Sequence, residues 1–146
     1  MTKRGYHHGN LRQALVDAAL GLIAEQGPTG FTMAEAAKRA DVSAAAPYRH
    51  FAGRDELIAE IATQGFELFA DVLEYAFDEG RPSPLVAFEA VGRAYLAFAR
   101  KYPGHYMAMF ESGISPTQTP ELTRASERAR RVLTRAADLL SARMPA

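Results

Sequence analysis

The sequence has no cysteine among its 146 residues, and it has no net charge because 17 acidic side chains balance 17 basic ones. Without cysteine, the chain can form neither a disulfide nor a thiolate zinc site, and it has no cysteine nucleophile. Charged residues interrupt every apolar run well short of the ~18 residues that a membrane span requires. The N-terminal residues contain no apolar stretch resembling a signal peptide, so we expect a cytoplasmic protein that does not enter a membrane.

The zero net charge conceals an uneven distribution along the chain. Residues 1–54 carry seven basic and four acidic side chains, residues 55–115 carry four and ten, and residues 116–146 carry six and three. A basic head before an acidic middle segment favours an anionic partner for the head. Hydrophobic residues make up 48% of the sequence, which is typical of a folded globular chain and excludes disorder as its main state.

Apolar residues recur with the spacing of helix faces, and no segment shows the sustained alternation of a β-strand. The sequence therefore predicts an all-α fold. Asn10 and Ser83 are suitable N-caps, Pro84 suits a first helical position, and Thr32 with Glu35 has the pattern of a capping box. The predicted helices cover about residues 10–26, 33–40, 44–51, 55–78, 84–101, 105–112 and 120–140.

The second and third predicted helices have the dimensions of a helix-turn-helix. The turn of such a motif needs a residue that tolerates left-handed backbone, which Asp41 can adopt, followed by an apolar residue, here Val42. Small residues are needed where the helices cross and where the second helix enters a major groove. Alanines meet both needs, at positions 36, 37 and 40 and at positions 44, 45 and 46.

Residues 31–57 read FTMAEAAKRADVSAAAPYRHFAGRDEL. This stretch resembles the tetracycline-repressor (TetR) family of bacterial transcription regulators. The similar features are a threonine-led helix of small residues, a Val-Ser turn, and Tyr-x-His-Phe followed by a basic residue and leucine. With the first helix, the similarity covers about residues 8–60, and the segments YHHGNLR (6–12) and YPGHYMAMF (102–110) resemble one subset of the family.

The resemblance implies a helix-turn-helix DNA-binding head of residues 1–54 and a helical regulatory body of residues 55–146 that binds an effector and dimerises. The implied partner is a double-stranded, pseudo-palindromic operator, with repression as the expected effect. By the resemblance, Thr32, Tyr48, His50 and Arg54 contact DNA phosphates, while Ala44, Ala45, Ala46 and Arg49 read bases. Lys3, Arg4 and Arg12 form a basic arm that could reach the adjacent groove or backbone.

The sequence departs from the family pattern in three ways. Asp41 replaces the usual turn glycine. Pro47 stands where leucine is common, and we expect it to distort the second helix because proline lacks an N–H donor. Family members have about nine helices, the last two of which build the dimer interface, whereas this sequence predicts seven. We therefore expect a chain that is either truncated or pairs differently.

Ten of the 14 aromatic residues lie in residues 55–115, and none follows Phe110. They are first of all core residues, but the same region encloses the inducer in the TetR family, which implies a small apolar or aromatic effector. The helix predicted at 84–101 should turn Leu85, Phe88, Val91, Tyr95 and Phe98 inward. The candidate pocket residues are Phe69, Tyr95, Phe98, His105, Tyr106 and Met109.

Two other classes of protein stay open at this point. One is a helical binding or structural bundle that uses the same small-residue packing without touching DNA. The other is a small helical enzyme that uses the aromatic pocket. The sequence offers little support for catalysis, because it has no phosphate-cradling glycine loop and no Ser-His-Asp order. Four scattered histidines give no metal site, and no cofactor is indicated.

Overall fold

The computed structural model describes residues 10–144, and every regular element in that range is helical. The predicted all-α fold is therefore confirmed for this part of the chain. Its elements are α2 (Leu11–Gln26), α3 (Met33–Arg39), the 3₁₀ turn η1 (Ala46–Arg49), α4 (Arg54–Phe77), the 3₁₀ turn η2 (Asp78–Gly80), α5 (Pro84–Lys101), α6 (Pro103–Phe110) and α7 (Pro120–Ser141). None of these helices combines the length and the hydropathy that crossing a membrane would require.

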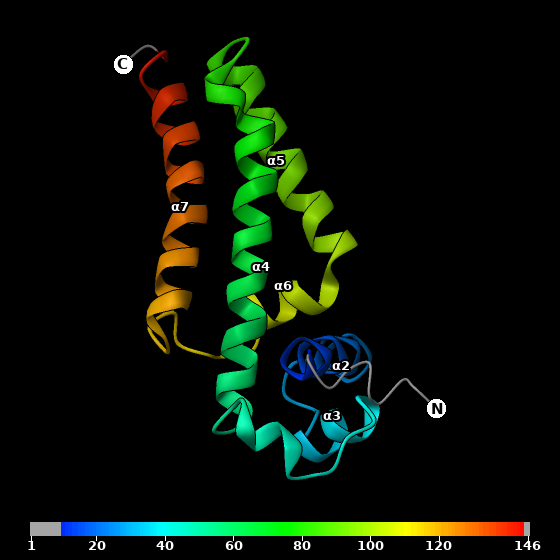
Figure 1. Ribbon diagram of the computed structural model, residues 1–146. Helices are drawn as coiled ribbons and strands as arrows, with labels where there is room; N and C mark the ends of the chain where they lie inside the picture. Colours follow the sequence, from blue (N-terminus) through cyan, green and yellow to red (C-terminus); the bar gives the residue numbers. More distant parts are fainter. Residues whose placement is uncertain (1–9, 145–146) are drawn as a thin grey trace.

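The long helix α4 forms the axis of the molecule (Figure 1). Its first turns lie beside the helix-turn-helix head, and its later turns pack against α5 and α7. The short helix α6 packs against both α4 and α2, so it joins the body directly to the head. Because α4 is shared by head and body, it can carry a displacement from one to the other. The division of the chain at residues 54 and 55 stays a prediction.

A single hydrophobic core extends from the head into the body. In the head, Leu15 of α2 is buried in the same cluster as Phe31 and Phe51. In the body, Phe69 of α4 packs against Phe98 of α5, with 4.9 Å between their ring centroids. Burial of each such side chain contributes about 1.5–3 kcal/mol. The continuity of the core means that head and body are not independently packed units.

Side-chain caps begin three of the helices. Thr32 and Glu35 form the predicted capping box, in which Glu35 N–H donates to Thr32 Oγ1 (3.1 Å) and Thr32 N–H donates to Glu35 Oε1 (2.8 Å). Ser83 accepts from the N–H of Val86 as predicted. Thr119 caps α7 in the same way. Asn10 occupies the N-cap position of α2, but its side chain makes no capping hydrogen bond.

The face that α5 turns inward differs from the prediction. Val91 and Phe98 are buried, but Leu85 is 54% exposed and Phe88 is 42% exposed. The buried stripe instead includes Ala87. Apolar side chains occur on more than one face of this helix, so periodicity could not decide which face meets α4 and α7.

Two glycines allow α6 to approach its neighbours closely. A Cβ atom on Gly65 of α4 would lie 2.6 Å from Sδ of Met109 on α6. A Cβ atom on Gly104 of α6 would lie 2.9 Å from the backbone oxygen of Leu20 on α2. Both distances are shorter than carbon atoms tolerate, so only glycine permits this packing without a shift of neighbouring atoms.

Candidate nucleic-acid interface and effector cleft

The turn of the helix-turn-helix has the predicted backbone. Asp41 adopts a φ of 62°, in the left-handed region. The N–H of Val42 then donates to the carbonyl of Ala37 (3.0 Å), and the Val42 side chain packs against the core. Ala36 and Ala37 are buried where α3 meets its neighbours. Asp41 thus supplies the left-handed residue that this turn requires.

The recognition segment is shorter and tighter than the predicted helix over 44–51. It is the 3₁₀ turn η1, in which Tyr48 N–H donates to the carbonyl of Ala45, three residues back, at 3.2 Å. Pro47 lies inside this turn and has no N–H, so it cannot make the i to i−4 bond of an α-helix. The predicted distortion by Pro47 is observed, and the predicted helix is wrong in its extent.

Most of the residues that the resemblance assigns to DNA are exposed together around η1. Tyr48 is 56% exposed, and His50, Arg49, Ala44 and Ala45 are exposed beside it, while exposed Thr32 begins α3. Ala46 is the exception, because it is only 4% exposed and packs inward. The assignment of Ala46 to base reading is therefore corrected.

Arg54 supports the head from below. Its Nε donates to the carbonyl of Phe31 (3.0 Å), its Nη2 donates to the carbonyl of Pro28 (2.5 Å), and its guanidinium lies 4.8 Å from the centroid of the Phe31 ring. The first residue of α4 is thereby tied to the loop before α3. Sequence spacing did not reveal this positioning role, because the partners lie more than 20 residues away.

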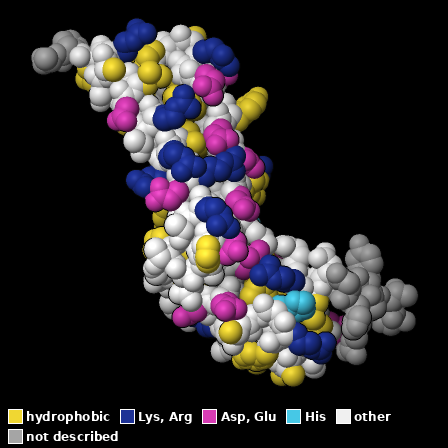
Figure 2. Space-filling view, turned by 60° about the vertical axis from the view of Figure 1, so that its left-hand side comes forward, with side chains coloured by type: hydrophobic (Ala, Val, Ile, Leu, Met, Phe, Trp, Pro, Cys, Tyr) yellow, Lys and Arg dark blue, Asp and Glu magenta, His cyan; other side chains and the backbone are white. Residues whose placement is uncertain are grey.

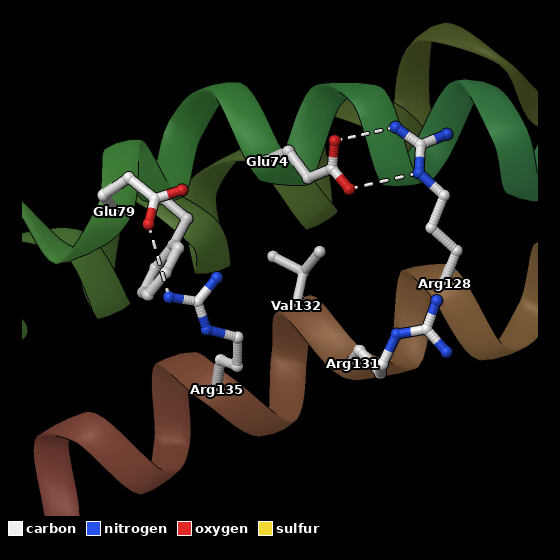
Figure 3. A pocket seen from close by; sticks show the side chains of 7 residues that line it. Glu74, Glu79, Arg128, Arg131, Val132 and Arg135 are labelled. Carbon is white, nitrogen blue, oxygen red and sulfur yellow. Dashed lines mark hydrogen bonds and ion pairs between the residues drawn. The ribbon is translucent and has the colours of Figure 1, made fainter.

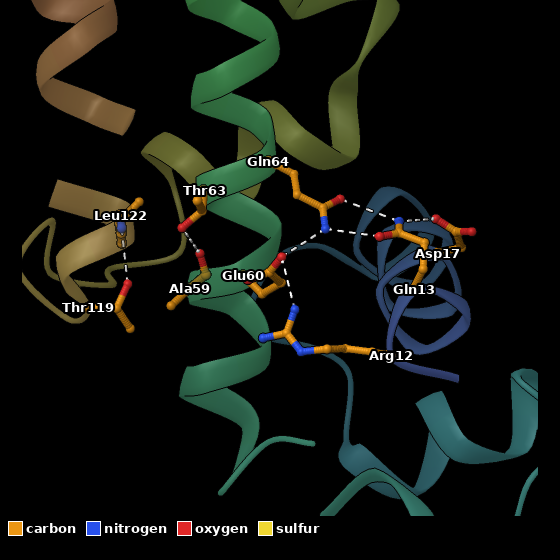
Figure 4. Close-up of polar contacts among 9 residues, drawn as sticks. All are labelled: Arg12, Gln13, Asp17, Ala59, Glu60, Thr63, Gln64, Thr119 and Leu122. Carbon is orange, nitrogen blue, oxygen red and sulfur yellow. Dashed lines mark hydrogen bonds and ion pairs between the residues drawn. The ribbon is translucent and has the colours of Figure 1, made fainter. Parts of the chain in front are cut away.

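Arg12 also makes contacts within the protein. Its Nη1 lies 3.2 Å from Oε2 of Glu60 on α4 (Figure 4). Its guanidinium lies 4.8 Å from the centroid of the Phe51 ring. In this conformation Arg12 braces α2 against α4 and does not extend as a free arm. Lys3 and Arg4, the other predicted arm residues, lie outside the described residues 10–144.

A second polar contact lies beside Arg12 at the junction of head and body (Figure 4). Gln64 Nε2 donates to Gln13 Oε1 (3.0 Å) and to Glu60 Oε2 (2.9 Å). Gln13 Nε2 donates to Asp17 Oδ1 (3.0 Å). The contact between Gln64 and Gln13 joins α4 to α2, whereas the other two bonds each lie within one helix.

The exposed cations of the head differ in whether an acidic side chain pairs with them. Arg39 is bound to Glu25 at 2.5 Å, and this hydrogen bond lowers the pKa of the Glu25 carboxyl. Lys38 and Arg49 are exposed and make no ion pair with any residue in the described range. In the view of Figure 2, basic and acidic side chains alternate along much of the body. Lys38, which sequence reasoning did not single out, is therefore, like Arg49, an exposed cation of the head without an ion-pair partner among residues 10–144.

A cleft, which we call the aromatic cleft, lies between α4, α5, α6 and α7 and has a volume of about 380 Å³. Phe69 and Tyr95 line it as predicted. The residues that sequence reasoning did not assign to it include Phe66, Phe110, Glu127, Arg130 and Leu133. Three of these come from α7, which carries no aromatic residue, so the clustering of aromatics could not indicate its part in the cleft.

The other four predicted pocket residues do not line this cleft. Phe98 and Met109 are buried core residues at 2% and 8% exposure. Tyr106 packs against Phe110, which does line the cleft, with 4.9 Å between their ring centroids. His105 lies toward α2 and α4, beside Tyr102. Phe98 and Met109 are taken up by the core, and Phe110, one turn after Tyr106 in α6, lines the cleft in its place.

Tyr95 carries the polar group most suited to contact a ligand in the cleft. Burial of its phenol raises its pKa, and the neighbouring Tyr106 raises it further. The Tyr95 hydroxyl therefore stays protonated and keeps its donor near neutral pH. At the rim, Arg130 donates to Glu127, and this pair neutralises the charge beside the opening.

We expect acid to destabilise the protein through His105. Burial lowers the pKa of His105, and Asp17 on α2 offsets part of this decrease. Because the unfolded chain binds the proton more readily, stability present above the ordinary pKa of 6.5 is lost as the pH falls through the folded-state value. His105→Gln should flatten this loss in urea unfolding between about pH 7.5 and pH 5. Equal pH slopes in both proteins would contradict the assignment.

No group of three or more histidine, aspartate or glutamate side chains within residues 10–144 has the arrangement of a metal site.

Two family models match the chain in succession. The model of the tetR family of bacterial regulatory proteins matches residues 15–61, and the model of the tetracyclin repressor-like C-terminal domain matches residues 88–146. The first covers α2, the helix-turn-helix and the start of α4. The second covers most of α5 and all of α6 and α7.

Individual proteins show the same similarity. An uncharacterized HTH-type transcriptional regulator of Haemophilus influenzae is 34% identical over 73 residues, 50% of this chain and 39% of that protein. The uncharacterized HTH-type transcriptional regulator YobS of Bacillus subtilis is 28% identical over 100 residues, 68% of this chain and 51% of YobS. The structure of a protein of unknown function from Rhodococcus sp. RHA1 matches 91% of this chain and 71% of that one, with a TM-score of 0.72 and 29% identity.

The chain thus spans about half or less of the length of the two regulators. Its helix-turn-helix and its body are each matched by a model from the same group of proteins, in the same order along the chain. From its sequence motifs, its fold and these matches, the chain belongs to the tetR family of bacterial regulatory proteins.

Proposed function

We propose that this protein is a transcription regulator that binds an operator sequence in double-stranded DNA. The observation that carries the proposal is the joint exposure of Tyr48 and Arg49 in η1 and of residues 44, 45 and 50 beside it, at the end of a helix-turn-helix whose turn and supporting contacts are formed. The arrangement suits a segment that enters a major groove, because its outward side chains at positions 44 and 45 are short. DNA as the partner also makes the cytoplasm the proposed compartment.

The proposed contacts divide into two kinds. Tyr48, His50 and Thr32 surround η1 with groups that can bind phosphate oxygens, and Lys38 adds a positive charge. Arg49, at the end of η1, is suited to a bidentate contact with guanine. Arg54 acts indirectly in this proposal, because its guanidinium holds the head to α4.

We further propose a homodimer that places two recognition segments in successive major grooves about 34 Å apart. An occupied operator would exclude polymerase, so repression is the proposed outcome. The effector would bind in the cleft and would be a small, uncharged apolar or aromatic molecule. Four aromatic rings line the cleft, and the charges of Glu127 and Arg130 compensate each other.

The structure suggests how occupation of the cleft would alter the head. Phe66 and Phe69 belong to α4, which begins at Arg54 beneath the head. Phe110 belongs to α6, which contacts α2 through Gly104. A ligand changes DNA affinity only if it binds one arrangement of these helices better than the other.

The experiment that tests DNA binding is selection of duplexes from random DNA by the full chain, followed by titration at several salt concentrations. We expect the logarithm of the affinity to fall linearly with the logarithm of salt, with a slope near −0.9 per neutralised phosphate. Light scattering on the complex gives its stoichiometry. Absence of duplex binding at modest ionic strength would favour a helical bundle or an enzyme without a DNA role.

Two tyrosines provide a matched pair of variants for this test. Tyr48 is 56% exposed beside η1, and Tyr75 is 89% exposed on α4 in the body. Tyr48→Ala should weaken binding to all duplexes about equally, because it removes a phosphate contact. Tyr75→Ala should leave the affinity unchanged. Equal effects of the two substitutions would place the DNA surface elsewhere.

A further inference from the structure

A second hollow, separate from the aromatic cleft, lies between the end of α4 and the middle of α7 (Figure 3). Its volume is about 380 Å³, and it shares no lining residue with the cleft. We call it the arginine groove, because Arg128, Arg131 and Arg135 of α7 line it. Spacings of three and four residues place these side chains along one face of the helix.

Two of the three arginines are already neutralised by acidic residues. Arg128 Nη2 lies 2.6 Å from Asp71 Oδ1 and 2.7 Å from Glu74 Oε1 on α4. These carboxylates raise the pKa of Arg128, chiefly through the hydrogen bonds of Glu74 and then of Asp71. Arg135 Nη2 lies 3.4 Å from Glu79 Oε1. Arg128 therefore links α7 to α4, and Arg135 links α7 to η2, the turn that follows α4.

Arg131 has no such partner. It lines the groove between the two paired arginines, and it is exposed (Figure 3). Its guanidinium makes neither a hydrogen bond nor an ion pair with any residue in the range 10–144. A guanidinium keeps its charge at all relevant pH values. Arg131 is therefore the one guanidinium lining the groove that no carboxylate of the described chain pairs with, although Asp71, Glu74 and Glu79 together match the charge of the three arginines.

The floor of the groove is apolar. Val132 and Phe77 line it, and they are 6% and 3% exposed. The guanidinium of Arg135 lies 5.1 Å from the centroid of the Phe77 ring and covers part of this floor. Figure 3 shows Val132 pointing from α7 into the space between the paired arginines.

We propose that the arginine groove binds a small amphipathic monoanion, meaning a carboxylate or sulfonate with a short apolar or aromatic body. The anionic group pairs with Arg131, whose planar guanidinium suits two parallel hydrogen bonds to such a group. The apolar body covers Val132. A monoanion suits the site better than a dianion such as a phosphate monoester, because Arg131 is the only lining guanidinium without a carboxylate partner in the described range. The volume falls at the lower end of the ~300–1,000 Å³ of small-molecule sites.

The test uses two probes of nearly equal shape and different charge, naphthalene-1-sulfonate and the neutral naphthalene-1-sulfonamide. Calorimetric titration of the full chain should show that the sulfonate binds and that Arg131→Gln weakens this binding about tenfold or more. The sulfonamide should bind both proteins equally, because any contact it makes is apolar. Arg131 is exposed and unpaired, so the substitution should not affect folding, which a urea midpoint verifies.

Arg93→Gln is the matched control, since Arg93 is an exposed arginine on α5 without an ion pair in the described range. It should leave binding of the sulfonate unchanged. Equal weakening by Arg93→Gln and Arg131→Gln would overturn the proposal in favour of a general charge effect. No difference between wild type and Arg131→Gln, or no binding of the sulfonate up to about 1 mM, would overturn it as well. None of these results depends on DNA binding.

Discussion

Gly104→Ala is expected to destabilise the protein by about 1–3 kcal/mol, the usual cost of forcing extra volume into a packed contact. The added Cβ would lie 2.9 Å from the backbone oxygen of Leu20, and a backbone atom cannot turn aside as a side chain can. The substitution must therefore move α6 away from α2, or distort one of them. The free energy of unfolding from urea titration measures the cost.

Gly92→Ala provides the control, because it makes the same chemical change in a helix with open space around it. A Cβ on Gly92 would meet no atom within 4 Å. This variant should be more stable than the wild type by about 0.5–1 kcal/mol, since alanine restricts the unfolded chain and favours helix. A loss of stability in both variants, or in neither, would contradict the contact between α6 and α2.

The same pair of variants tests the proposed route between the cleft and the head. If α6 holds α2 in place, Gly104→Ala should change DNA affinity or its dependence on effector, whereas Gly92→Ala should change neither. Unchanged DNA binding in a destabilised Gly104→Ala protein would restrict α6 to a structural role.

Arg49→Ala is expected to lower affinity for the selected operator about tenfold and to relax preference at one base position. A bidentate contact with a base contributes about 1–3 kcal/mol of discrimination, and Arg49 is the only arginine that η1 contains. The measurement is repeated selection of duplexes with the variant, with comparison of base frequencies at each position. A selected sequence identical to that of the wild type would contradict the assignment of Arg49.

Lys38→Ala removes the same charge from the head without removing a base contact. Lys38 lies in the last turn of α3 and is exposed. This variant should weaken binding to all duplexes alike. It should also make the slope of log affinity against log salt concentration shallower by about the contribution of one phosphate contact. A change of sequence preference in Lys38→Ala would contradict the proposal, because it would show that Lys38 contacts a base and not only a phosphate.

Local features of the head could be predicted from the sequence because their partners are close neighbours. The capping box joins Thr32 to Glu35, three residues later, and forms as predicted. Asp41 adopts the left-handed backbone that the turn requires. Pro47 disturbs the segment that follows, and its missing N–H is a property of the residue itself. None of these features needs a distant part of the chain.

Other features depend on residues far apart in the sequence. Arg12 meets Glu60, and Arg128 meets Asp71 and Glu74 across the interface of α4 and α7. Charge counts along the chain could suggest that acids and bases pair, but they could not say which pairs form. The tertiary structure alone separates Arg131, which has no partner in the described range, from the paired arginines on either side of it.

The sequence by itself determined the helical fold, the helix-turn-helix and the family, because helix faces, caps and turns depend on residues that are close together in the chain. Only the tertiary structure decided which side of α5 is buried, which aromatics line the cleft, and that Ala46 points inward while Tyr48 stays exposed. The physical reason is that burial depends on how helices rotate against one another. That rotation results from packing across the whole core, including glycine contacts such as that of Gly104 with Leu20.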